Sequence, residues 1–189
     1  MLSSRFEDAM VFAAQLHSEQ VRKGSKTPYI AHLMATASLV LENGGGEDEA
    51  IAALLHDAIE DQGGKRIGME IRMLFGEKVA GIVEACSDAD TIPKPPWRGR
   101  KEAYLERLKS ASPSVILVSM ADKLHNARSL LRDYRRDGAT MWDKFNGGKD
   151  GTLWYYRSLV EIYQPNGSDS LVNELELVVT ELEKLTALE

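Results

Sequence analysis

The most informative stretch of this sequence is Leu54-Leu55-His56-Asp57-Ala58-Ile59-Glu60-Asp61, which directly follows the apolar segment Ile51-Ala52-Ala53. The apolar spacing predicts a helix over residues 47–60, closed by the glycine pair at 63–64. On such a helix His56, Asp57, Glu60 and Asp61 share one face. A carboxylate that emerges from a buried segment needs a cation to offset its desolvation, and a divalent metal is the natural partner. A helix end with solvated acids and one capping histidine is the alternative for this stretch alone.

The rest of the chain also has helical spacing, because glycine and proline fall between the apolar segments and no convincing strand alternation is present. Ser112 followed by Pro113 is typical of an N-cap and a first helical position. We therefore predict an all-α protein that forms a single compact multi-helix domain. The expected helices cover approximately residues 4–21, 27–43, 47–60, 67–75, 79–86, 98–109, 113 to beyond 131, 153–163 and 171–185.

Length and composition exclude several classes of protein. The chain has 189 residues, 43% of them hydrophobic, which fits one globular domain. Its apolar runs are far shorter than the roughly 20 residues of a membrane-spanning helix, and no secretory signal precedes the first helix, so a cytoplasmic protein without membrane contact is expected. The net charge of −6 argues against a nucleic-acid surface. A single cysteine, Cys86, excludes thiolate metal clusters, so any metal must bind through histidines and carboxylates.

The C-terminal quarter carries a repeated apolar pattern. Leucines and valines recur at spacings of four and three, as in a coiled-coil seam, over only about two heptads. We predict a domain over residues 1–165 with a C-terminal helix within 166–189 that packs on it, and we expect a monomer or a homodimer.

Basic residues crowd segments 94–109 and 128–136, whereas the C-terminus is acidic. Local basic patches on an acidic protein favour a small polyanionic ligand.

Two further elements strengthen the metal hypothesis. His32 follows Thr27-Pro28 about one turn into its helix, and Asp122 follows five apolar or small residues. Asn126 and Ser129 lie four and seven residues beyond Asp122, on the same helix face. Alone, His32 reads as a core histidine and Asp122 as a buried capping or salt-bridge carboxylate. Together with the His-Asp pair they favour a metal site with polar groups for a substrate beside it.

The order His32, then His56-Asp57, then Asp122 resembles the HD-domain metal-dependent phosphohydrolases. Within that family, four blocks look like the hydrolase domain of the RelA/SpoT alarmone enzymes over about residues 5–163. These blocks are Arg22-Lys23-Gly24, Thr27-Pro28-Tyr29-Ile30-Ala31-His32, the stretch at 54–61, and Ala121-Asp122-Lys123-Leu124-His125-Asn126-Ala127-Arg128. The resemblance implies a stand-alone small alarmone hydrolase.

The resemblance also implies roles for single residues. His32, His56, Asp57 and Asp122 would hold one divalent ion, usually Mn²⁺ in this family, although other first-row metals suit the same ligands. Glu60 and Asp61 would position and deprotonate the attacking water. Substrate contacts would come from Arg22, Lys23, Asn126 and Ser129, while His125 is expected to be structural. Trp154, Tyr155 and Tyr156 form either an aromatic wall for a purine or core packing.

The implied reaction is hydrolysis of the 3′-diphosphate of a guanosine or adenosine alarmone, (p)ppGpp or (p)ppApp, with release of pyrophosphate. One alternative is a phosphatase for another nucleotide, such as the 2′-phosphate of NADPH. A second alternative is a non-catalytic alarmone-binding module. Segments 88–100 and 145–152 depart from the better-known hydrolases, and the sequence leaves their roles and the base preference open.

Overall fold

The structure is a computed structural model that describes residues 1–89, 93–165 and 169–187. It confirms the all-α class, because the only β pairing in these residues is an isolated bridge between Val21 and Pro28. The helices are α1 (Ser4–Leu16), α2 (Ile30–Glu42), α3 (Glu47–Leu55), α4 (Ala58–Gln62), α5 (Gly64–Phe75), α6 (Glu77–Cys86), α7 (Trp97–Leu108), α8 (Pro113–Asp137), the 3-10 helix η1 (Gly138–Lys144), α9 (Gly148–Tyr163) and α10 (Asp169–Thr186).

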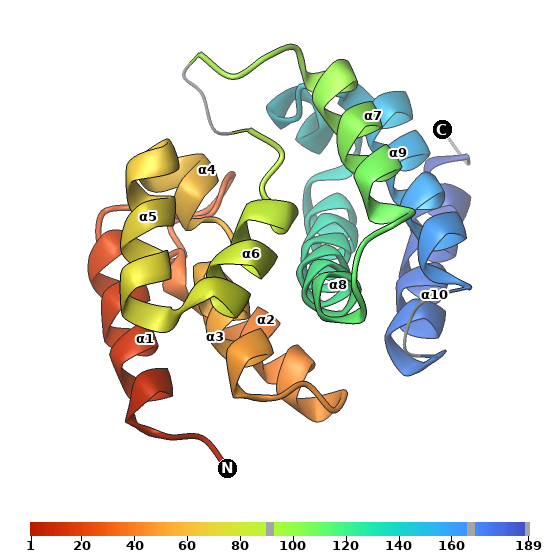
Figure 1. The fold of residues 1–189 in the computed structure, drawn as a ribbon. Coiled ribbons are helices and arrows are strands. Elements are labelled where there is room, and N and C mark those ends of the chain that lie inside the picture. The colour runs from red at the N-terminus through yellow and green to blue at the C-terminus, as the bar shows by residue number, and fades with distance from the viewer. Residues whose placement is uncertain (90–92, 166–168, 188–189) are drawn as a thin grey trace.

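Helix α8 organises the packing. It contacts α2, α3 and α6 on one side and α9 and α10 on the other, so that it separates the helices of the N-terminal half from the last helices of the chain (Figure 1). Met120 and Leu124 in its middle are buried within this core. Ser112 caps α8 by accepting a hydrogen bond from the Val115 N–H, and Pro113 occupies its first turn, as predicted.

The predicted first helix is too long. It ends at Leu16, and the chain then turns back on itself at Gly24, whose φ of +79° suits glycine. The Arg22 N–H donates to Thr27 O at 2.8 Å, and the Tyr29 N–H donates to Gln20 O at 2.9 Å. This turn delays α2 to Ile30, and it places the basic residues of the turn beside α2 instead of on a helix end.

The predicted helix over residues 47–60 is wrong in one respect, because it breaks at His56 and Asp57 into α3 and α4. The His56 side chain bonds the Ala53 carbonyl through Nδ1 at 2.7 Å, and this is the carbonyl that would accept the Asp57 N–H in a continuous helix. Asp57 instead becomes the N-cap of α4, where its carbonyl accepts from the Asp61 N–H. At this break the Asp57 carboxylate lies beside the imidazoles of His32 and His56.

Helix α10 packs on α8 and α9 through buried Leu171, Leu175, Val179 and Leu182. Ion pairs join its acids to the basic residues of α8 and α9, among them Arg128–Glu174 and Arg135–Glu181. Arginines 128 and 135 are therefore engaged within the fold and do not form a free polyanion site. The domain boundary at 165/166 falls beside residues outside the described ranges and stays a prediction. None of the described helices is long and apolar enough to cross a bilayer.

Candidate active site

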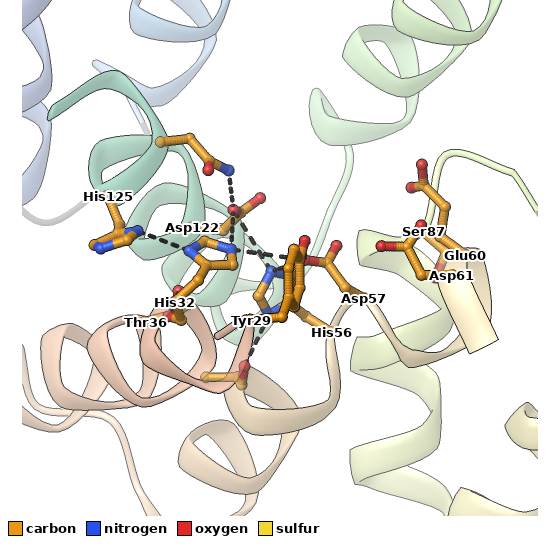
Figure 2. Close-up of polar contacts among 12 residues, drawn as sticks. Tyr29, His32, Thr36, His56, Asp57, Glu60, Asp61, Ser87, Asp122 and His125 are labelled. Carbon is orange, nitrogen blue, oxygen red and sulfur yellow. Dashed lines mark hydrogen bonds and ion pairs between the residues drawn. The ribbon is translucent and has the colours of Figure 1, made fainter. Parts of the chain in front are cut away.

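The four predicted metal ligands meet at one place from three elements (Figure 2). His32 comes from the first turn of α2, His56 and Asp57 from the break between α3 and α4, and Asp122 from the middle of α8. The His32 Nε2 lies 3.6 Å from Asp57 Oδ2 and 3.2 Å from Asp122 Oδ1. The His56 Nε2 lies 3.0 and 3.5 Å from the same two oxygens. Ligand atoms of His32, His56 and Asp57 all lie within 4.8 Å of one another.

The donor set fits a divalent cation. Both Nε2 atoms are buried and have no hydrogen-bond partner among the residues that the structure describes. The Nδ1 of His56 faces a carbonyl oxygen, which can only accept, so Nδ1 carries the hydrogen and leaves the Nε2 lone pair toward the carboxylates. The Nδ1 of His32 is held by His125 Nδ1 at 2.7 Å, which fixes the ring orientation. Two imidazole nitrogens and two carboxylates that converge on one point favour a positive charge between them.

The electrostatics of the cluster lead to the same conclusion. Burial raises the pKa of the Asp57 carboxyl, but His56 and His32 together outweigh burial and hold that pKa well below its ordinary value. The same applies to Asp122, for which the Lys123 ammonium is the largest opposing influence. Burial lowers the pKa of His56, yet the two carboxylates outweigh it and hold this pKa well above the ordinary value. The cluster thus binds a proton tightly when no metal competes for the site.

Further hydrogen bonds orient the two carboxylates. The Tyr29 hydroxyl donates to Asp57 Oδ2 at 2.6 Å. Asp122 accepts from Lys123 at Oδ2 and from the Asn126 amide at Oδ1. The aspartates are therefore fixed before any metal binds, and Tyr29 and Lys123, to which the sequence analysis assigned no role, belong to the site.

A cavity of about 570 Å³ adjoins the cluster. All four predicted substrate contacts line it, namely Arg22, Lys23, Asn126 and Ser129. The Arg22 guanidinium donates to Asn126 Oδ1 at 2.6 Å, and the Lys23 ammonium lies 5.4 Å from the centroid of the Phe145 ring. Asn126 thus links Arg22 to Asp122, whereas the Ser129 hydroxyl donates to the His125 carbonyl at 3.1 Å.

The cavity also contains two lysines that sequence reasoning did not assign, together with two tyrosines of the predicted aromatic segment. Lys101 and Lys123 add two cations, and Tyr155 and Tyr156 supply aromatic surface. Trp154, the third residue of the proposed aromatic wall, instead lies under the Arg98 guanidinium at 3.3 Å from the ring centroid. Lys123 directly follows Asp122 in the sequence, and this adjacency could have indicated that Lys123 belongs to the site. Lys101 comes from α7, and only the fold places it here.

Glu60 and Asp61 do not converge with His56, because the helix break turns α4 away from α3. Figure 2 shows both acids on the far side of Asp57 from the imidazoles. The Lys94 ammonium contacts Glu60 Oε1 at 2.9 Å and Asp61 Oδ1 at 3.1 Å. Burial raises the pKa of Glu60, and the charges of Asp88 and Asp57 raise it further, against the opposing effect of Lys94. Asp61 also lines the cavity.

Comparison with known proteins agrees with this geometry. The model of the HD domain matches residues 9–153. The chain is 41% identical over 128 residues to the guanosine-3′,5′-bis(diphosphate) 3′-pyrophosphohydrolase MESH1 of Xenopus tropicalis, covering 66% of this chain and 69% of that protein. It is 36% identical over 132 residues to the bifunctional (p)ppGpp synthase/hydrolase SpoT of Escherichia coli K12, covering 67% of this chain and 18% of SpoT.

A solved structure gives the same result over nearly the whole chain. It belongs to a metazoan orthologue of SpoT described as hydrolysing ppGpp, with a role in starvation responses. The similarity has a TM-score of 0.79 at 26% sequence identity and covers 96% of this chain and 97% of the other. The shared fold therefore includes the helices that carry the cluster and the cavity.

Proposed function

Because the chain belongs to the HD-domain family of metal-dependent hydrolases, we propose that it hydrolyses the 3′-diphosphate of (p)ppGpp and releases pyrophosphate, with Mn²⁺ as its metal. The observation that carries the proposal is the pair of buried Nε2 atoms, without a hydrogen-bond partner in the described part of the chain, that face two aspartates beside a cavity lined with cations. The adenosine counterpart (p)ppApp presents the same diphosphate and is proposed as a second substrate.

His32, His56, Asp57 and Asp122 would hold the metal. Imidazole and carboxylate without thiolate suit Mn²⁺, and the two aspartates balance its formal charge. When bound there, the ion supplies Lewis acidity that polarises a phosphoryl oxygen and lowers the pKa of a water molecule. Tyr29, Lys123, Asn126 and His125 keep the ligands in place through the hydrogen bonds described above.

The cavity is suited to a nucleotide that carries two diphosphates. Its volume of about 570 Å³ lies within the range of small-molecule sites. Arg22 and Lys23 line it together with Lys101 and Lys123, so four cations face a polyanionic ligand. Guanidinium and ammonium groups pair with phosphate oxygens, and Tyr156 and Phe145 offer apolar surface to a base. The cavity is also lined by two acids, Asp61 and Asp133, so its cations outnumber its carboxylates although the protein as a whole is acidic.

Glu60 and Asp61 would serve the attacking water. The bond that breaks joins the ribose O3′ to the first phosphorus of the 3′-diphosphate, and the water oxygen forms the new bond to that phosphorus. Glu60 Oε1 would accept a proton from the water, and a proton would pass to O3′ as pyrophosphate leaves. The raised pKa of Glu60 brings this carboxylate closer to the operating pH of a general base. Lys94 must leave Glu60 for this transfer.

One incubation tests the proposal. The purified protein is given Mn²⁺ and, separately, ppGpp, ppApp, NADPH or a nucleoside monophosphate, and the products are separated by anion-exchange chromatography. We expect pyrophosphate with GDP or ADP from the alarmones, and no product when a chelator is present. Orthophosphate released from NADPH as the main product would replace the proposal with a 2′-phosphatase. Binding of ppGpp without any product would favour the non-catalytic module.

A further inference from the structure

A buried carboxylate outside the cavity holds two of the cations near it. Asp88 follows α6, and its side chain is only 3% exposed. It accepts from Arg100 and from the Lys101 ammonium, the latter at 2.6 Å. Asp88 itself faces a separate hollow between α5 and α6 that includes Gly68 and Met69. The Asp88–Lys101 ion pair therefore joins this hollow to the cavity, because Asp88 lines the one and Lys101 lines the other.

Lys101 depends on this carboxylate. Its side chain is 18% exposed and its ammonium lies 4.9 Å from the centroid of the Tyr155 ring, at the wall of the cavity. Burial lowers the pKa of Lys101, the neighbouring Lys123 ammonium lowers it further, and Asp88 is the largest opposing charge. Without Asp88, a half-buried ammonium beside a second ammonium would have to lose its proton or swing toward solvent.

Arg100 links Asp88 to Pro95, which lies just before α7. Besides Asp88, its guanidinium donates to the Pro95 carbonyl at 3.0 Å and lies 3.8 Å from Glu60 Oε1. Pro95 is the neighbour of Lys94, which contacts both proposed water-activating acids. One carboxylate thus pairs with a cation at the substrate cavity and with Arg100, which holds Pro95 next to the Lys94 that contacts Glu60.

We propose that Asp88 is a positioning residue, which holds Lys101 charged and directed into the cavity so that Lys101 can bind the substrate diphosphate, while Asp88 itself touches no substrate. The proposal rests on the proposed function in one respect, namely that the cavity receives a diphosphate. It predicts that Asp88 and Lys101 act as one unit in substrate and pyrophosphate binding, because the effect of the carboxylate on binding passes through the ammonium.

A double-mutant cycle tests this coupling. Asp88→Asn, Lys101→Met and the double variant are compared with wild type in kcat and KM for ppGpp and in the affinity for inorganic pyrophosphate by calorimetry, with thermal unfolding of each variant recorded. Asp88→Asn should raise KM and weaken pyrophosphate binding about tenfold, with a smaller change in kcat. In the Lys101→Met background the same substitution should change either quantity less than twofold.

Asp137→Asn is the matched control. Asp137 also pairs with two cations, Arg136 and Lys144, but it lies outside the residues that line the cavity. This variant should leave KM and pyrophosphate affinity at the wild-type values. If Asp88→Asn does not fold, Asp88→Glu takes its place, because the longer arm keeps the charge and displaces Lys101. Its rise in KM, expected to be severalfold, should also vanish in the Lys101→Met background.

The outcomes separate the two proposals. Effects of Asp88→Asn and Lys101→Met that multiply in the double variant, or pyrophosphate affinity unchanged by Asp88→Asn, would overturn the positioning role. Failure of the wild type to hydrolyse ppGpp would overturn the proposed function alone, since the pyrophosphate-binding cycle would still decide whether Asp88 acts through Lys101.

Discussion

The metal cluster and the rim around Glu60 treat charge in opposite ways. In the cluster, the buried Nε2 atoms of His32 and His56 find no hydrogen-bond partner among residues 1–89, 93–165 and 169–187, and two aspartates face them. At the rim, the acids are already matched by cations, as Lys94 is to Glu60. The cluster requires a cation from outside the protein. At the rim, the protein's own cations must leave their acids to pair with a substrate. A single charge change should therefore have a larger effect in the cluster than at the rim.

The two regions also differ in what holds them in place. The cluster is built on helix ends and on the centre of α8, all packed in the core. Beside the rim, the Trp97 ring at the start of α7 packs against Gly147, the N-cap of α9, and against Gly151 in the first turn of α9. A Cβ added at Gly147 would come within 2.6 Å of the Trp97 ring, and one at Gly151 within 3.1 Å. Segments 88–100 and 145–152, whose roles the sequence left open, thus meet through the residues of each that the structure describes.

The largest effect is expected from removing a cluster ligand. His56→Ala and Asp57→Ala should abolish turnover and metal content together, because no neighbouring side chain can replace either ligand. Metal is measured by elemental analysis after dialysis, and hydrolysis by release of pyrophosphate. A variant that loses its metal but keeps near-wild-type hydrolysis would show that the cluster is not the metal site.

A rim acid should give a smaller and more selective loss. Glu60→Gln keeps size and hydrogen bonding but removes the carboxylate that accepts the proton. Turnover should fall roughly 10²-fold, the scale of general-base loss, while metal content is retained. Nucleotide affinity should stay the same or rise slightly, because one negative charge is gone. Simultaneous loss of metal, affinity and turnover would instead assign Glu60 to the cluster.

The sequence predicted the cluster better than the rim for a physical reason. His56-Asp57 and Asp122 sit in segments whose apolar neighbours already indicate burial, and a buried charge indicates a partner. The helix break at 56–57 escaped prediction, because it depends on the His56 side chain capturing the Ala53 carbonyl. The pairing of Lys101 with Asp88 also escaped it, since the two residues lie 13 positions apart and only the fold brings the residue after α6 to the side chain on α7.

The seat of Trp97 can be tested without changing any charge. Gly147→Ala should push Trp97 and the start of α7 outward, at a cost of about 1–3 kcal/mol in the free energy of unfolding. KM should rise because Lys101 moves with α7. Gly99→Ala is the matched control in the same helix, since a Cβ there meets nothing within 4 Å. It should leave KM unchanged and stabilise the helix slightly. Equal effects of the two substitutions would exclude the Trp97 seat.

The smallest effect is expected at Cys86, the last residue of α6, which belongs to neither region. Cys86→Ser should leave metal content and turnover essentially intact, and a loss of metal in this variant would place the ligands elsewhere.

Burial raises the pKa of the Cys86 thiol to about 12, from an ordinary value near 9. Between these two values the unfolded thiol ionises while the folded thiol does not, so ionisation favours unfolding as the pH rises through this window. Chemical denaturation at pH 8 and pH 10 should therefore show a steeper loss of stability in wild type than in Cys86→Ser. An identical pH dependence in the two proteins would mean that the thiol is not shielded by the fold.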